Sequence, residues 1–327
     1  MINITSWTDL AAISSAPTES YILTKDLTAN SPDYVSAGGN AWVPIASFSG
    51  TFDGNGYVIA DLTIDVAIIS GNGKKGLFGI LYGATITNLG VVGALVKGYD
   101  YVGILAAQAA SATNISKCYS SGEVTGFCNV GGLVGEVNTT STVTNCYSKA
   151  DVFGILQDST SYYGGLIGLV YDVGATVSNS YSTGKVTMPD GSGAYWVAGF
   201  IGANVYGTVN YCYSTGLVTN GQAPVGFAGA YGAHYNYCGW FCHPTGPQTP
   251  GTPGETVVVY EVKKGGGGSF IDDTEDWFYS KARAIYSAWD FATPVWYEHL
   301  EHGGRYPTLR KQEINSVLPM FLGQDLV

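Results

Sequence analysis

The chain has 327 residues, of which 12% are charged, and its formal net charge is −11. This charge disfavours nucleic acid as a partner, because phosphate binding needs clustered basic side chains and only 14 Lys and Arg residues are spread over the chain. A composition with 46 Gly and 24 Tyr but 3 Met argues against helices and favours short strands joined by tight turns. The N-terminus shows no basic region followed by an apolar one, and no apolar run approaches the ~18 residues of a membrane helix. We therefore expect neither a secretory leader nor membrane insertion.

The predicted elements begin with an N-terminal cap and first strands at residues 1–60. Residues 6–13 predict a short amphipathic helix with Ser6 or Thr8 as its N-cap residue. A strand is expected at residues 21–24. Such a cap covers the strand edges that an open-ended sheet would expose.

Two strings of residues then recur in step over residues 61–243. The first is Gly-apolar-apolar-small, and its copies begin at Gly76, Gly103, Gly132, Gly165, Gly199 and Gly226. The second follows each copy at a near-constant offset, as in the string STVTNCYS that begins at Ser141. Each repeat holds about three strand-like runs and cannot bury its apolar face alone, whereas stacked repeats can. We therefore predict an all-β fold, a right-handed parallel β-helix (solenoid) of about six repeats.

Stacked repeats place equivalent residues above one another, so the second string predicts three columns. A core column of small apolar side chains is expected at Leu89, Cys118, Cys146, Ser180, Cys212 and Cys238. A bend is expected at the preceding position, where left-handed backbone and side-chain bonding along the stack are predicted for Asn88, Lys117, Asn145, Asn179 and Tyr211. The position after the core column is expected to face outward, as a row of aromatics formed by Tyr119, Tyr147, Tyr181 and Tyr213.

The cysteines are interpreted as small buried hydrophobes of the core column. A chain of this size does not need disulfides to fold. The alternative that adjacent turns are bridged, by Cys118–Cys146 or Cys212–Cys238, stays open because neighbouring rungs bring Cα atoms close enough.

The C-terminal quarter differs from the repeats. Residues 244–269 are predicted to be Pro- and Gly-rich loops that contain one strand, and residues 270–310 to form a C-terminal closure. The tail, residues 311–327, is apolar. It either folds back along the coil or docks on a partner, and we favour docking. The predicted docking residues are Val317, Leu318, Met320, Phe321 and Leu322.

The repeat region offers no obvious catalytic centre. Glycan-cleaving enzymes on this kind of fold need paired carboxylates or a carboxylate–metal–basic cluster. The acidic residues of the coil occupy different repeat columns: Asp65, Asp100, Glu123, Glu136, Asp151, Asp158, Asp172 and Asp190. We therefore predict no catalytic residues and no enzymatic activity.

Metal and cofactor signals are equally weak, and we predict no metal site and no cofactor. Cys238, Cys242, His243 and His234 give a poor zinc pattern, because two of these donors belong to one core column. Calcium is the alternative at Asp272, Asp273 and Glu275, or at Asp53 with Asn55, but turn chemistry explains these residues more simply.

The repeated string resembles the motif of the GLUG-motif repeat proteins, whose name quotes Gly-Leu-apolar-Gly. The literal string begins at Gly76, Gly132 and Gly165, and the Trp-, Gly- and Pro-containing segments at residues 42–56 and 289–309 also resemble the family. The resemblance implies a parallel β-helix of the kind used in bacterial surface adhesins, in non-catalytic regions of large secreted proteases and in some phage-encoded proteins. It implies no reaction, and the metalloprotease signature His-Glu-x-x-His is absent from the sequence.

These patterns predict a non-enzymatic binding or structural module displayed on a virion, as a fibre, spike or capsid decoration, or on a cell surface. Alternatives are a bacterial adhesin repeat domain and a tailspike-like polysaccharide-degrading enzyme. The expected partner is a cell-surface glycan or protein, or another virion subunit, and a homotrimer is suggested by analogy with β-helical spikes. The outward Tyr row would bind that partner, or would instead stabilise the coil by stacking on itself.

Overall fold

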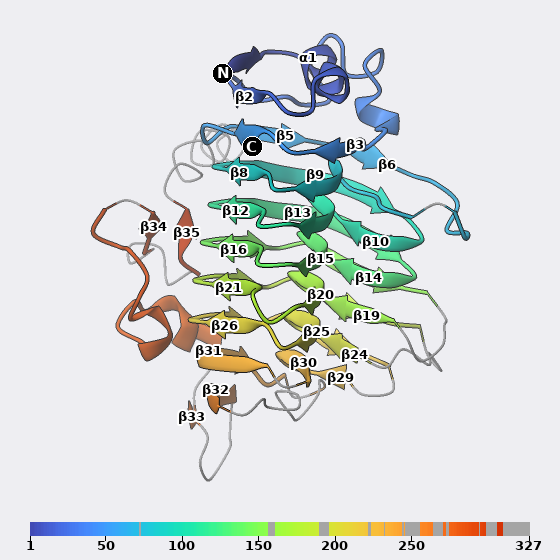
Figure 1. The fold of residues 1–327 in the computed structure, drawn as a ribbon. Helices are drawn as coiled ribbons and strands as arrows, with labels where there is room; N and C mark the ends of the chain where they lie inside the picture. The colour runs from blue at the N-terminus through green and yellow to red at the C-terminus, as the bar shows by residue number, and fades with distance from the viewer. Residues whose placement is uncertain are drawn as a thin grey trace, which may run out of the picture.

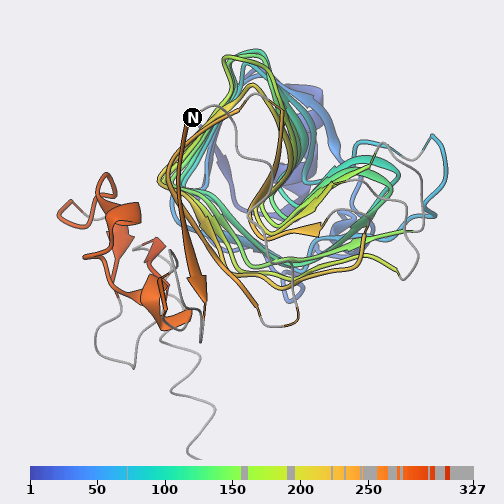
Figure 2. The same cartoon turned by 90° about the horizontal axis from the view of Figure 1, so that it is seen from below.

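The computed structural model describes residues 1–71, 73–155, 161–189, 196–221, 224–231, 233–243, 245, 256–263, 271–272, 275–293, 295–298 and 306–309. The chain is a parallel β-solenoid of about six turns, which confirms the predicted fold class. Figure 1 shows the turns stacked from the N-terminal end downward. Figure 2 looks along the coil and shows successive turns superimposed. Each inner strand pairs with the strands one turn before and one turn after it, as Ile115 does with Ile86 and Val143.

Two of the three parallel sheets lie back to back. The first, sheet B, consists of β3 (Ile45–Phe48), β7 (Phe78–Tyr82), β11 (Ala106–Ala110), β15 (Val134–Asn138), β20 (Ile167–Tyr171), β25 (Ile201–Val205) and β30 (Ala228–Tyr231). The second, sheet C, consists of β10 (Asp100–Gly103), β14 (Cys128–Gly131), β19 (Tyr162–Gly164), β24 (Trp196–Ala198) and β29 (Pro224–Val225).

The remaining strands of the coil belong to sheet A, which turns a corner inside each repeat. Before the corner lie β4 (Thr51–Asp53), β8 (Thr85–Thr87), β12 (Asn114–Ser116), β16 (Thr142–Thr144), β21 (Thr176–Ser178), β26 (Thr208–Asn210) and the first part of β31 (His234–Phe241). After it lie β5 (Val58–Ala60), β6 (Thr63–Ile64), β9 (Gly90–Lys97), β13 (Tyr119–Gly126), β17 (Tyr147–Ser148), β18 (Asp151–Gly154), β22 (Tyr181–Ser182), β23 (Val186–Thr187), β27 (Tyr213–Ser214) and β28 (Val218–Thr219).

In the copies that begin at Gly132 and Gly165, the last glycine of the motif allows sheet B to approach the backbone of sheet C. A Cβ atom on Gly135 would lie 2.7 Å from the backbone N of Val102, and one on Gly168 would lie 2.5 Å from that of Val130. Real Cβ atoms do not approach backbone this closely, so these positions accept only glycine without rearrangement. At Gly135 and Gly168 the motif glycine is therefore required for the close packing of sheets B and C.

The first glycine of the motif meets the next turn and a buried serine. A Cβ atom on Gly199 would lie 2.3 Å from the carbonyl oxygen of Gly226. The Ser182 hydroxyl donates to the carbonyl oxygen of Gly199 (2.5 Å), and the Ser214 hydroxyl donates to that of Gly226 (2.7 Å). These serines follow the tyrosines of the second string, so hydrogen bonds tie the two recurrent strings together.

The predicted bend in sheet A is confirmed, but the predicted side-chain ladder along it is wrong. The five residues of the corner column have positive φ, at Asn88 (54°), Lys117 (54°), Asn145 (55°), Asn179 (48°) and Tyr211 (55°). The Asn88 amide donates to Asp53 (2.9 Å), whereas the Asn145 oxygen accepts from the indole of Trp296 (3.1 Å). The side-chain oxygen of Asn179 has no hydrogen-bond partner. Lysine and tyrosine interrupt the asparagines, so an unbroken amide ladder cannot form.

The N-terminal end of the coil is covered as the sequence predicts. Helix α1 (Trp7–Ala12) begins at Ser6, whose hydroxyl accepts from the Asp9 N–H (3.1 Å), so Ser6 is the N-cap residue. Strand β1 (Ile2–Ile4) pairs with β2 (Ser20–Leu23), and β2 pairs with β4 of the first turn. Short 3₁₀ helices span Ile13–Ser15 and Gly39–Ala41.

Beyond the last turn the chain folds back along the coil. The predicted further strand is present as β32 (Thr256–Lys263), which pairs with β31 and is followed by β33 (Ile271–Asp272). Two 3₁₀ helices follow at Glu275–Tyr279 and Ala284–Tyr286, and β34 (Trp296–Tyr297) pairs antiparallel with β35 (Thr308–Leu309). Figures 1 and 2 show this segment, coloured orange, beside the coil and outside it. We call its described residues 275–293, 295–298 and 306–309 the C-terminal clasp.

Candidate functional site

The row of tyrosines predicted to bind a partner forms a stack on the outside of sheet A. Successive rings have centroids 5.0, 4.8 and 4.9 Å apart and lie within 9° of parallel, from Tyr119 through Tyr147 and Tyr181 to Tyr213. The column therefore exists as the repeat predicts, and its rings stack on one another.

The prediction that this Tyr row is exposed is wrong. Tyr147, Tyr181 and Tyr213 have no exposed surface and Tyr119 has 6%, because the clasp packs over them with Trp277, Phe278, Tyr286, Trp289 and Trp296. The row presents no free face to a ligand, and the alternative of stacking that stabilises the coil describes what is seen.

Hydrogen bonds fix the clasp to separate turns of the coil. The Trp289 indole donates to the carbonyl oxygen of Tyr211 (2.9 Å), and the Trp296 indole donates to Asn145. The hydroxyls of Tyr306 and Thr215 lie 2.6 Å apart. The clasp is thus held at three points in two different turns, one that contains Asn145 and one that contains Tyr211 and Thr215.

The core column lies where the repeat predicts. Leu89, Cys118, Cys146, Ser180, Cys212 and Cys238 are all fully buried. The backbone N–H of Cys118 donates to the sulfur of Cys146 (3.4 Å), and that of Cys146 donates to the hydroxyl of Ser180 (3.1 Å), so each side chain contacts the next turn. All six cysteines lie in the described part of the chain and none forms a disulfide.

Only Cys128 is expected to react with a thiol reagent in the native protein. Cys118, Cys146, Cys212, Cys238 and Cys242 are buried, whereas Cys128 is half-buried. Because the thiolate is the reactive form and must be reached by the reagent, burial suppresses the others. Titration with DTNB at about pH 8 should therefore count one thiol per native chain and all six in denaturant. Fewer than six in denaturant without reductant would show that a disulfide had formed.

Alkaline pH is expected to destabilise the coil. Burial raises the pKa of the Cys238 thiol to about 12 and holds the pKa of the Cys212 thiol and of the Tyr181 phenol well above their usual values. In the unfolded chain these groups ionise near 9.0 (Cys) and 10.0 (Tyr), so above about pH 9 the unfolded state binds fewer protons than the native state. The free energy of unfolding then falls as pH rises, and below pH 9 these groups have no effect. Urea unfolding at about pH 8 and about pH 10.5 measures this, and equal midpoints would contradict it.

The weak metal patterns do not assemble into a ligand set among the described residues. No group of three His, Cys, Asp or Glu side chains there could hold a metal ion. His243 contacts the carbonyl oxygen of Thr215 through Nε2 (2.6 Å), and Asp53 accepts from the backbone N–H of Asn55 (2.7 Å), which is a turn contact. Asp273 and the side chains of Asp272 and Glu275 lie outside the described residues.

Two acidic side chains of the coil are engaged by separate structural partners. Asp65 forms an ion pair with Lys97 (2.8 Å), and Asp151 accepts from the backbone N–H of Lys185 (2.8 Å). Burial raises the pKa of the Asp100 carboxyl. Asp158 and Asp190 lie outside the described residues.

Glu136 is the most enclosed of these carboxylates, with 7% of its surface exposed. Its Oε1 accepts from the amides of Gln108 (2.9 Å) and Asn138 (2.7 Å), and its Oε2 accepts from the amide of Asn129 (3.0 Å). Gln108, Glu136 and Asn138 belong to β11 and β15 of sheet B, and Asn129 reaches across from β14 of sheet C. The result is a cluster of amides oriented around one carboxylate.

Exposed aromatics lie at the end of sheet B, where the sequence did not predict them. Tyr82 closes β7 and is 60% exposed, and Tyr171 closes β20 and is 59% exposed. Both occupy one column with Ala110 and Asn138, because Tyr82 pairs with Ala110 and Tyr171 with Asn138. Each tyrosine stands three residues after the last glycine of its motif, Gly79 or Gly168. This shared offset is the one feature of the sequence that could have predicted the row.

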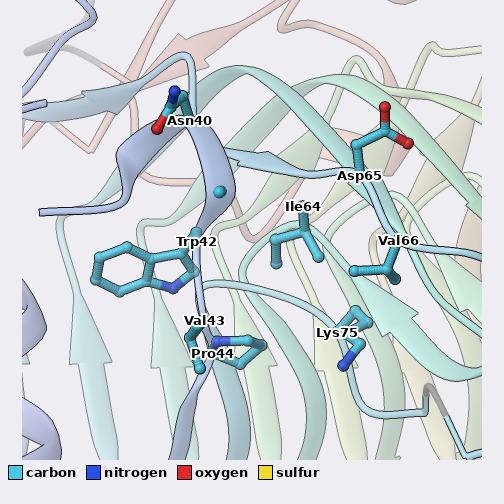
Figure 3. A pocket seen from close by; sticks show the side chains of 9 residues that line it. Asn40, Trp42, Val43, Pro44, Ile64, Asp65, Val66 and Lys75 are labelled. Carbon is cyan, nitrogen blue, oxygen red and sulfur yellow. The ribbon is translucent and has the colours of Figure 1, made fainter. Parts of the chain in front are cut away.

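A shallow pocket lies near the N-terminal end of the coil (Figure 3). Its volume is about 210 Å³, and Trp42, Pro44, Ile64 and Val66 give it a largely apolar lining with Lys75 at one side. The indole N–H of Trp42 already donates to the carbonyl oxygen of Leu77 (3.1 Å). The pocket therefore offers apolar contact beside three polar side chains, Asn40, Asp65 and Lys75.

The described part of the chain contains no helix long and apolar enough to cross a membrane. The predicted docking residues Val317, Leu318, Met320, Phe321 and Leu322 lie outside the described residues.

Comparisons with known proteins agree with this architecture. The GLUG motif matches at residues 128–152. Halomucin from Haloquadratum walsbyi (strain DSM 16790 / HBSQ001) is 35% identical over 133 residues, which make up 38% of this chain and 1% of Halomucin, so the chain spans a very small part of that relative.

Two solved structures share the fold at 20% sequence identity. The crystal structure of a candidate immunoglobulin A1 protease from Bacteroides ovatus matches with a TM-score of 0.63, over 94% of this chain and 92% of that chain. A structure named IgA1 Protease matches with a TM-score of 0.58, over 80% of this chain and 21% of that chain. At this identity the likeness concerns the fold alone. The motif match and the repeated copies of the motif along the coil confirm that the chain resembles the GLUG-motif repeat proteins.

Proposed function

We propose that this β-helix is a non-enzymatic binding or structural module displayed outside a cell, on a virion as a fibre, spike or capsid decoration, or on a cell surface as an adhesin-type domain. The observation that carries the proposal is that acidic side chains of the coil are engaged in structural hydrogen bonds and ion pairs. Glu136 is engaged by three amide donors, Asp65 by Lys97, and Asp151 by a backbone N–H. These carboxylates act as acceptors that hold the coil together.

The construction of the coil supports the same proposal. Glycines bring sheets B and C into backbone contact, and the core column bonds turn to turn through Cys146 and Ser180. Ser214 bonds across the inside of its own turn, and the clasp covers one flank. Such a rod holds the side chains on its surface in fixed positions, which suits binding because little conformational freedom is lost on association.

Location and attachment give the first test. Antibodies against the protein should label intact cells or purified particles of the producing organism, and the purified protein should attach to host cells or assemble with particle subunits. Labelling confined to the cytoplasm, with no attachment, would refute the proposal.

Turnover gives the second test, because the named structural neighbours raise the alternative of a cleaving enzyme. The protein is incubated with host polysaccharide and with immunoglobulin A1, and reducing ends, unsaturated products and cleaved heavy chain are measured. We expect none of these products. Turnover that disappears when one acidic residue is changed would replace the binding module with an enzyme.

A further inference from the structure

We infer that the C-terminal ends of the sheet B strands β7, β11, β15 and β20 carry a binding site for an uncharged glycan chain that runs along the coil axis from Tyr82 to Tyr171. We call the five residues Tyr82, Gln108, Glu136, Asn138 and Tyr171 the glycan strip. This inference rests on the proposed function, since it names the ligand class of the binding module.

The register of sheet B places these residues together. Tyr82, Ala110, Asn138 and Tyr171 form one column over β7, β11, β15 and β20, and Gln108 and Glu136 form the column two residues earlier. Tyr82 and Tyr171 are three rungs apart, which at ~4.8 Å per rung is roughly 14 Å along the axis. Two exposed aromatic rings thus flank a cluster of amides on one rigid surface.

The chemistry of the strip matches a sugar. A pyranose presents an apolar C–H face and a hydroxyl edge, so it needs flat amphipathic rings and groups that both donate and accept hydrogen bonds. Tyr82 and Tyr171 supply the rings, and the half-buried amides of Gln108 and Asn138 supply both kinds of hydrogen-bonding group. Ala110, between Tyr82 and Asn138, adds no bulk that would lift a chain off the surface.

Glu136 positions the amides. Its Oε1 accepts from both Gln108 and Asn138, and this holds the two amide nitrogens toward each other. Each amide retains a second N–H, and its oxygen has further lone-pair capacity for a hydroxyl. The three donors on Glu136 therefore order the polar half of the strip before a ligand binds, which lowers the entropic cost of binding.

Other occupants fit the strip less well. An extended peptide would need a free strand edge, but β11 and β15 pair with a strand on both sides. A polyanion would be repelled by the Glu136 carboxylate and by the net charge of −11 on the protein. The nearby cation is Lys74, whose ammonium lies 3.4 Å from the Gln108 oxygen, and one positive charge does not offset this repulsion. Charge thus favours an uncharged ligand.

Affinity electrophoresis of the full chain tests the inference. Gels contain dextran, galactomannan or xyloglucan as neutral polymers, or polygalacturonate as an anionic one. We expect retardation by at least one neutral polymer and none by polygalacturonate. Tyr82→Ser and Tyr171→Ser should each weaken binding roughly five- to tenfold, and the double variant should abolish retardation.

Both tyrosines are exposed, so these variants should fold, and unchanged melting temperatures check this. Tyr297→Ser is the matched control, because Tyr297 is an exposed tyrosine of the clasp, away from the strip, and its replacement should leave retardation unchanged. No retardation by any neutral polymer, equal retardation of the double variant, or stronger retardation by polygalacturonate would each overturn the inference. If the double variant still attaches to cells or particles like the parent protein, the glycan strip fails while the proposed function stands. If instead the neutral polymer is cleaved, the proposed function itself fails.

Discussion

A Tyr181→Ala variant is expected to lose about 3–5 kcal/mol of the free energy of unfolding, the range seen when a large buried aromatic side chain is truncated. The Tyr181 ring lies between Tyr147 and Tyr213 and also contacts Trp289, Trp296 and Tyr306 of the clasp. Truncation would open a cavity between two rigid layers that cannot easily collapse into it. Urea or thermal unfolding followed by circular dichroism measures the loss.

Two further variants separate burial of the ring from the tyrosine hydroxyl. The Tyr181 hydroxyl is buried and has no hydrogen-bond partner, so Tyr181→Phe should be neutral or slightly stabilising. Tyr171→Ala, which removes an exposed ring, should change stability by no more than about 0.5 kcal/mol. If Tyr181→Ala proved as mild as Tyr171→Ala, the clasp would not cover the Tyr row.

The second large effect is expected at the last glycine of a motif. In Gly168→Ala the new Cβ would lie 2.5 Å from the carbonyl carbon of Asn129 and 2.5 Å from the backbone N of Val130. Both contacts are with the backbone of a paired strand, so relief requires sheets B and C to separate. We expect a loss of about 3 kcal/mol or more in the free energy of unfolding, at the upper end of overpacking effects.

Gly73→Ala is the control for this glycine. A Cβ there would meet its nearest atom, the carbonyl oxygen of Asp100, at 3.4 Å, which is ordinary van der Waals contact. This variant should lie within about 0.5 kcal/mol of the parent protein in the same unfolding experiment. Equal losses for Gly73→Ala and Gly168→Ala would show that the motif glycine is not kept for its close packing.

Much of the fold could be predicted because its information is local and repeated. The step between copies sets the pairing of strands, and small or apolar residues at one position of the second string predict the core column. Asn at the preceding position indicates the left-handed bend. Strand pairing, the core column and the bend each depend on neighbouring residues or on the next repeat. All three can therefore be predicted from the sequence without coordinates.

The candidate site could not be predicted in the same way. Burial of the Tyr row depends on Trp296, which contacts Asn145 from 151 residues away, and no repeat pattern encodes that contact. The pairing of Tyr82 and Tyr171 in one column is not evident from the sequence, because the two intervening turns carry Ala110 and Asn138 at that position and only the strand register aligns them. The Glu136 cluster depends on Asn129 from sheet C, and the approach of the two sheets follows from glycines whose role is clear only in three dimensions.

The clasp also changes how the coil can come apart. A solenoid in which each turn contacts only its neighbours can fray one turn at a time from either end. Here Trp289 is bonded to Tyr211 and Trp296 to Asn145, so one short segment spans turns that do not touch each other. If only the last turn unfolded, the clasp would still be anchored to Asn145. Unfolding that starts at the C-terminal end must therefore release the clasp first. The C-terminal half of the rod should therefore unfold as a single cooperative block and resist proteases that attack partly opened ends.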